Sequence, residues 1–199
     1  MASSSRSLSF VYLITFVLAG CSILYELIIA QTISMLATNT GVWYSLTIGF
    51  YLAAMGWGAI RCPKKQDLLG SWNLLFKVEV ILSILGALCV LLIQGAHIFL
   101  IFLRQWNIFI CGLILFFGIS LLMIIGIGFF TGLELPLLIR TARQLSDAAR
   151  PNRILGIDYF GSLAGAIIFP LGLLPYLELI TIGFLTAALN LGIALVILW

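Results

Sequence analysis

Long runs of apolar residues, broken by short polar stretches, fill the sequence from about residue 9 to its end. A bilayer with a hydrocarbon core of about 30 Å requires ~20 apolar residues in each helix that crosses it. The pattern therefore predicts an all-α chain: a polytopic bundle of about six membrane-spanning helices forming one domain over residues 1–199. The predicted spans are residues 9–37, 42–61, 76–96, 106–132, 156–175 and 178–198.

Three local signals refine this outline. Residues 97–103, "HIFLIFL", form too short a run to cross a bilayer, and we expect them at the interface. The polar connection at residues 133–155 has helical spacing that we expect Pro151 to stop, and it either runs along the membrane surface or serves as a solvated linker. Gly161 and Gly165 form a GxxxG pair, which predicts close approach of another helix.

Composition supports a membrane protein over a soluble one. The chain is 63% hydrophobic and 9% charged, whereas a soluble domain is about 25% charged. The run "LAGC" ending at Cys21 matches the cleavage pattern of a bacterial lipoprotein signal, but the apolar run continues beyond it. We therefore expect the first helix to be retained and to stay in the membrane.

The basic residues predict an orientation. Nine of them fall in connections on one side of the predicted bundle, and only Arg104 falls on the other. This asymmetry matches the positive-inside rule and places both termini in the cytoplasm, with the bacterial inner membrane as the expected location. The net charge of +3 then reflects topology and not nucleic-acid binding. The nine residues are Arg6, Arg61, Lys64, Lys65, Lys77, Arg140, Arg143, Arg150 and Arg153.

Three carboxyl groups lie in or beside apolar segments, where a charge costs ~2.5–3.5 kcal/mol at a helix centre. Glu26, preceded by Tyr25, falls near mid-membrane in the first predicted span. Glu134 precedes Pro136, where we expect a kink or the end of the helix. Asp158 is predicted in the first turn of the fifth span, where the helix dipole would stabilise it.

These acids have two readings. In the functional one, Glu26, Glu134 and Asp158 face a polar cavity open to the cytoplasm and hold a cation, a proton or an amine. In the structural one, Glu134 and Asp158 pair with basic residues at the interface, and Lys77 and Glu79 form a further interfacial pair. The candidate basic partners are Arg140, Arg143, Arg153 and Lys77.

No metal site or cofactor is predicted. The four cysteines lie far apart, and His97 has no neighbouring ligand type. The sequence contains no Ser/His/Asp set and no phosphate-binding loop, so we expect no catalytic residue in this chain.

Three segments resemble a known family. These are residues 19–59, "AGCSILYELIIAQTISMLATNTGVWYSLTIGFYLAAMGWGA", residues 128–140, "GFFTGLELPLLIR", and residues 153–179, "RILGIDYFGSLAGAIIFPLGLLPYLEL". Together they resemble the helices of membrane-bound spermidine synthase-like proteins. In that family a cytoplasmic Rossmann-like aminopropyltransferase domain commonly follows the membrane unit, and the present sequence stops where that domain would begin. Gly156 stands where the family often has Tyr.

The resemblance implies a non-catalytic membrane unit that anchors or partners a cytoplasmic aminopropyltransferase-like enzyme and holds a polyamine or another cation. The lipid bilayer, other protein subunits and a second copy of the chain are the expected partners. Two alternatives stay open: a small dimeric transporter or channel that uses Glu26, and a purely structural subunit of a larger membrane complex.

Overall fold

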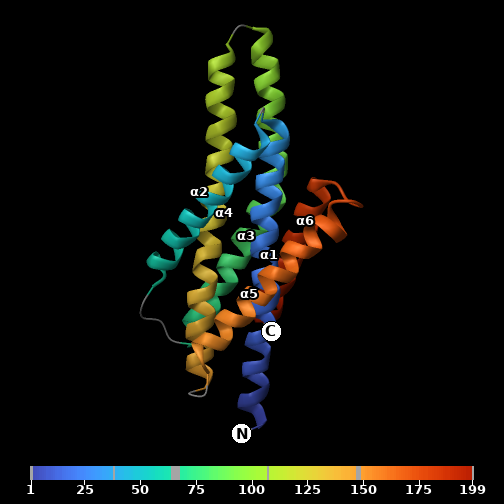
Figure 1. The fold of residues 1–199 in the computed structure, drawn as a ribbon. Coiled ribbons are helices and arrows are strands. Elements are labelled where there is room, and N and C mark those ends of the chain that lie inside the picture. The colour runs from blue at the N-terminus through green and yellow to red at the C-terminus, as the bar shows by residue number, and fades with distance from the viewer. Residues whose placement is uncertain (1, 38, 64–67, 107, 147–148, 199) are drawn as a thin grey trace.

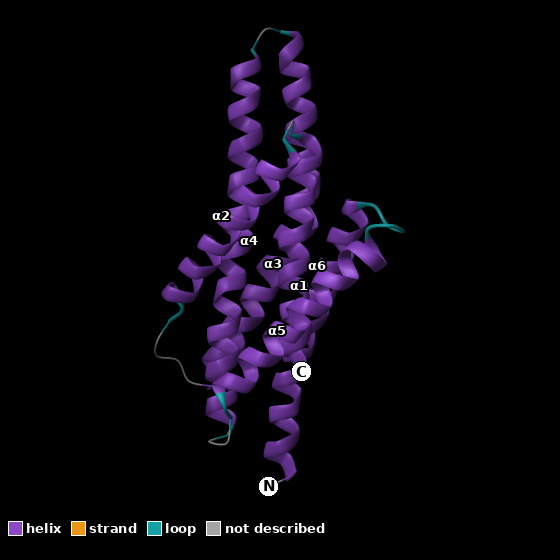
Figure 2. Cartoon of the chain, in the orientation of Figure 1, coloured by secondary structure: helices purple, strands orange, loops and turns teal. Residues whose placement is uncertain are grey.

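The described part of the chain is helical throughout. The computed structural model describes residues 2–37, 39–63, 68–106, 108–146 and 149–198, with side chains from residue 8 to residue 197. Within these ranges there is no strand, which confirms the predicted all-α class (Figure 2). The elements are α1 (Ala2–Leu36), α2 (Thr40–Arg61), α3 (Leu68–Gln105), α4 (Phe109–Leu145), α5 (Pro151–Ile168), the π-helical turn η1 (Phe169–Leu173) and α6 (Leu179–Leu198).

Five stretches of helix are long and apolar enough to cross a membrane. They are Leu8–Leu36 of α1, the whole of α3 and α4, residues Pro151–Leu173 of α5 with η1, and Leu179–Ile197 of α6. Helix α2 coincides with the predicted span 42–61 but is not among these five.

The helices pack in a set order (Figure 1). Helix α3 lies against α4 and α6, α1 lies against α5, and α2 lies against α4. We call the end of the bundle at which α2 and α4 finish and α5 starts the basic end, because it carries Arg61, Arg140, Arg143, Arg150 and Arg153. Both chain termini lie in that half of the molecule (Figure 1). Lys64, Lys65, Trp199 and the side chain of Arg6 lie outside the described residues.

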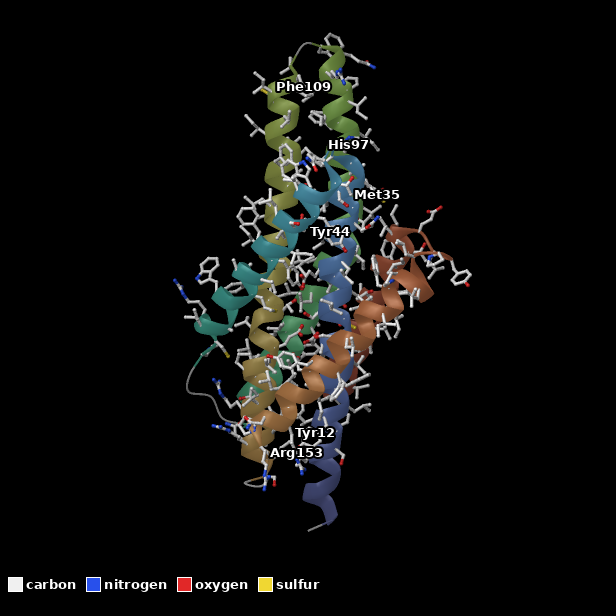
Figure 3. All side chains as sticks on the ribbon, viewed as in Figure 1. Tyr12, Met35, Tyr44, His97, Phe109 and Arg153 are labelled. Atoms are coloured by element: carbon white, nitrogen blue, oxygen red, sulfur yellow. The ribbon has the colours of Figure 1, made fainter. Side chains whose placement is uncertain are left out.

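The hairpin of α3 and α4 projects beyond the other helices at the opposite end. Residues 97–103 are not a separate element, because α3 continues through them to Gln105, and their position at the membrane interface stays a prediction. The segment contains no helix breaker, and it packs on α4, where the rings of His97 and Phe116 lie 5.6 Å apart. In Figure 3, His97 lies near the level of the α1–α2 turn, and the hairpin extends past it to Phe109.

The structure bears on two proline predictions. Helix α4 continues through Pro136 and ends only at Leu145, which rules out an end of the helix beside Glu134, while the kink at Pro136 stays a prediction. Pro151 does not stop a helix, because it is the first residue of α5, a position where the missing N–H leaves no hydrogen bond unmade. Asp158 is consequently the eighth residue of α5, and the first-turn dipole explanation for it does not apply.

Small residues allow two close contacts between helix backbones. Gly161 and Gly165 of α5 lie against the backbone of α1 at Phe16 and Gly20. On α4, a second glycine pair four residues apart, Gly128 and Gly132, lies against the backbone of α2, and the sequence reasoning did not single this pair out for packing. At such sites the absent side chain lets two backbones meet. These contacts hold α1–α5 and α2–α4 as two tight pairs.

Candidate functional site: a cavity with three carboxyl groups

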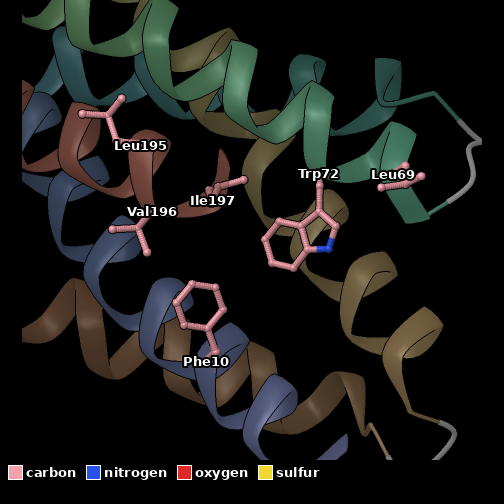
Figure 4. A pocket seen from close by; sticks show the side chains of 6 residues that line it. All are labelled: Phe10, Leu69, Trp72, Leu195, Val196 and Ile197. Atoms are coloured by element: carbon pink, nitrogen blue, oxygen red, sulfur yellow. The ribbon is translucent and has the colours of Figure 1, made fainter. Parts of the chain in front are cut away.

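Two of the cavities differ in the chemistry of the residues that line them. One, of about 570 Å³, lies between α1, α3 and α6 and is lined by aliphatic and aromatic side chains without a charged group (Figure 4). The residues that line it are Phe10, Leu69, Trp72, Leu195, Val196 and Ile197. The other, of about 950 Å³, lies between α1, α2, α4 and α5 and has polar and charged side chains among its lining residues. The second cavity is therefore the candidate site.

The cavity brings together the three acids that the sequence places on three different helices. Glu26 of α1, Glu134 of α4 and Asp158 of α5 all line it. Glu26 is 7% exposed and Glu134 is 5% exposed, so both carboxyl groups are largely shielded from solvent. The tight α1–α5 and α2–α4 pairs position these helices around one space. The acids therefore face a shared cavity and are not scattered over the surface.

Tyr25 belongs to a different part of the structure. Its side chain is fully buried and lies against Gly86 of α3, and it does not line the cavity. Its hydroxyl group has no hydrogen-bond partner within the described residues. Adjacent residues on a helix point about 100° apart, which explains why Glu26 reaches the cavity while Tyr25 reaches α3.

A buried hydrogen-bond cluster ties three helices together beside the cavity. The Tyr51 hydroxyl of α2 donates to the backbone carbonyl of Ser22 on α1 at 3.1 Å. It also lies 3.1 Å from the Thr131 hydroxyl of α4, which can donate to it. Ser22 and Thr131 both line the cavity. Tyr51 therefore fixes the spacing of α1, α2 and α4 around the site.

The lining becomes basic toward the end of α4. Arg140, Arg143 and Gln144 line the cavity there. The Nη2 atom of Arg140 lies 3.9 Å from the Cys62 sulfur, just past the end of α2. Burial raises the pKa of the Cys62 thiol, and the positive charge of Arg140 opposes that rise.

The predicted pairing of these acids with basic residues is not found. Within the described residues, neither Glu134 nor Asp158 forms an ion pair with the predicted partners Arg140, Arg143, Arg153 and Lys77. Both acids share the cavity with Arg140 and Arg143. Among the described residues, the cavity thus contains acidic and basic side chains that form no ion pair with one another.

A fourth acid was misjudged from the sequence. Glu79 is fully buried, and neither of its carboxyl oxygens has a hydrogen-bond partner within the described residues. Helices α3 and α4 are antiparallel, and Leu85 lies near Gly126, so about two turns further along Glu79 falls opposite Glu134. The two carboxyl groups lie within electrostatic range of each other. Glu79 thus extends the acidic group behind the wall of the cavity.

The arrangement offers several hydrogen-bond acceptors to a cationic ligand. Within the described chain, no three His, Cys, Asp or Glu side chains converge as ligands for a metal ion. The shielded carboxyl groups can accept charge-assisted hydrogen bonds from a cation, and these are among the stronger hydrogen bonds in proteins. The hydroxyl groups beside them can contribute further hydrogen bonds to a polar ligand.

Comparison with known proteins gives consistent relatives. The chain is 32% identical over 187 residues to a polyamine aminopropyltransferase of Leptospira interrogans, a match that covers 92% of this chain and 34% of the relative. It is 33% identical over 199 residues to polyamine aminopropyltransferase 2 of Ralstonia nicotianae, covering 98% and 36%. A polyamine aminopropyltransferase of Oceanobacillus iheyensis is 31% identical over 196 residues, covering 98% and 36%.

The similarity involves only part of each relative. The chain spans about a third of the length of the curated relatives it matches. No protein-family model matches the chain. No solved structure matches it either.

Proposed function

We propose that this chain is the membrane-spanning unit of a spermidine synthase-like system, and that its cavity holds an amine cation for an aminopropyltransferase. The observation that carries the proposal is the convergence of Glu26, Glu134 and Asp158 on one cavity of about 950 Å³. The unit itself is non-catalytic, and it anchors or partners the enzyme.

The chemistry of the cavity supports an amine as the ligand. Three carboxyl groups from three helices offer several separate acceptors, and an amine with more than one ammonium group can use them together. Because Glu26 and Glu134 are largely shielded from water, a bound cation would meet little screening by solvent.

Two further observations support the anchoring role. Five stretches of helix are long and apolar enough to cross a bilayer, and relatives named polyamine aminopropyltransferase share about a third of their length with this chain. The basic end, where Arg140 and Arg143 line the cavity, faces the cytoplasm by the positive-inside rule. This proposal places both termini in the cytoplasm and the bundle in a bacterial inner membrane.

A direct binding measurement tests the amine site. Radiolabelled spermidine and putrescine are equilibrated with the purified chain in lipid nanodiscs, for wild type and for the variants E26Q, E134Q and D158N. We expect each variant to weaken binding about tenfold, the effect of losing one charge-assisted hydrogen bond.

The matched control is E178Q, because Glu178 is exposed and does not line this cavity. Equal affinity in all four variants would remove the amine site from consideration. Transport of the amine into proteoliposomes, abolished by E26Q, would favour the transporter alternative over a holding site.

The partnership is tested separately. The tagged chain is purified from cells of its own source under mild detergent, and co-purifying soluble proteins are identified by mass spectrometry. We expect an aminopropyltransferase among them. If no such enzyme co-purifies and amine binding is intact, the anchoring role is ruled out and the amine site is retained.

A further inference from the structure

The cavity contains two basic side chains, Arg140 and Arg143, that the binding of an amine does not use. Arg140 and Arg143 line it from the last turns of α4. Residues three apart on a helix lie on the same face, about 5–6 Å apart at Cβ. The two arginine side chains therefore extend from one face of α4 into a region where an ammonium ion would be repelled.

Arg140 lacks an acceptor that matches its charge. Its Nη1 atom is buried and has no hydrogen-bond partner within the described residues, and its Nη2 atom makes only the 3.9 Å contact with the Cys62 sulfur. A thiol is a weak acceptor. A guanidinium group presents a planar fork of donors that fits phosphate and carboxylate oxygens in pairs.

The two walls of the cavity formed by α2 and α5 carry apolar side chains beside their polar ones. Helices α2 and α5 form opposite sides of the cavity, and they are not packed against each other (Figure 1). Leu52, Met55 and Ala59 of α2 face the space from one side, and Leu155 of α5 faces it from the other. The space between these helices therefore offers apolar contacts near the arginines, in addition to the polar side chains of α5.

We propose that Arg140 and Arg143 form a phosphate subsite for a membrane phospholipid, whose acyl chains lie in the opening between α2 and α5. The charge of the headgroup phosphate complements the two guanidinium groups, and the acyl chains match the apolar walls. This subsite lies in the same cavity as the three acids but uses different side chains, and it does not depend on the amine proposal. A bound phosphate would neutralise the two arginines.

The test measures phospholipid retained by the purified chain. After extensive washing in detergent, native mass spectrometry and a phosphorus assay count the lipid molecules held by wild type and by the double variant R140Q/R143Q. We expect wild type to retain phospholipid, and we expect the double variant to bind short-chain phosphatidylglycerol at least about tenfold more weakly. The control R153Q removes an exposed arginine at the same end that does not line the cavity, and it should bind as wild type does.

Competition on the wild-type protein keeps the test decisive even when a variant fails to fold. Short-chain phosphatidylglycerol should displace the retained lipid, whereas a short-chain diacylglycerol, which lacks phosphate, should not. Displacement by diacylglycerol to the same extent would overturn the phosphate subsite. Equal displacement by inorganic phosphate would overturn the lipid as its occupant, because the acyl chains would then contribute nothing.

Discussion

The phenol ring of Tyr25 on α1 lies directly against Gly86 on α3, so close that a methyl group at Gly86 would fall 2.6 Å from the phenol oxygen. Real side-chain carbon atoms do not approach that closely, and either the ring or the helix would have to move. The contact fixes how near α1 approaches α3, and therefore how deeply Glu79 is enclosed. This contact and three other buried groups, those of Tyr51, Glu79 and Cys62, each give a testable prediction.

Substituting Gly86→Ala should destabilise the bundle by about 1–3 kcal/mol, the usual cost of overpacking a filled core. The measurement is the thermal unfolding of the purified chain in detergent. Gly95→Ala on the same helix is the control, because nothing lies within 4 Å of its added methyl group. Equal unfolding temperatures for the two variants would contradict the contact. Tyr25→Phe should cost nothing, since the hydroxyl has no partner to lose.

Substituting Tyr51→Phe should destabilise the bundle by about 1 kcal/mol, because it removes the hydrogen bond to the Ser22 carbonyl and leaves that of Thr131 unmade. The same unfolding assay checks it. Tyr176→Phe is the matched control, since Tyr176 is 81% exposed. A Tyr51 variant as stable as the control would mean that the hydroxyl contributes nothing to the spacing of α1, α2 and α4.

Substituting Glu79→Leu should raise stability by about 1–3 kcal/mol, because no hydrogen bond is lost and a buried polar group without a partner is removed. Glu178→Leu, at an exposed position, should leave stability nearly unchanged. Unfolding in detergent is again the measurement. A marked loss of stability in the Glu79 variant would show that the carboxyl group has a partner that the native chain requires.

Alkylation of Cys62 should become fast only at pH values above those at which an ordinary thiol reacts, because the thiolate is the reactive form and burial raises the pKa of this thiol. The rate of N-ethylmaleimide modification is followed by mass spectrometry as pH increases, in a background that lacks the other three cysteines. Arg140→Gln should move the profile to still higher pH, since the opposing positive charge is removed. Arg143→Gln should leave it in place, and a profile unaffected by Arg140→Gln would refute the contact.

The helical class and the three candidate acids could be predicted from the sequence because both follow from the free-energy cost of moving groups between water and hydrocarbon. Apolar runs of this length are typical of helices that cross a membrane. A carboxyl group within such a run costs free energy and is therefore a candidate functional residue. Their convergence on one cavity remained one of two open readings, because it depends on Gly128, Gly132, Gly161 and Gly165 setting which helices pair. A single sequence shows that such residues permit close packing without showing which partner they meet.

Glu79 shows where a local pattern misleads. Its neighbour Lys77 suggested an interfacial pair, yet residues two apart on a helix point to different sides. Lys77 is exposed, whereas Glu79 is fully buried against the other helices. The two-residue spacing between Lys77 and Glu79 therefore predicts that they face different sides of α3, with Glu79 on the buried side.

The projecting hairpin gives the molecule a dependence on its lipid surroundings. Helix α3 has 38 residues and α4 has 37, so each is about 55 Å long at 1.5 Å per residue, against a hydrocarbon layer of about 30 Å. Such rods fit a thin bilayer only by leaning, by thickening the lipid around them or by standing out from its surface. Hydrophobic mismatch then becomes a variable that acts on this chain, and lipids with longer acyl chains would hold the two long helices more upright.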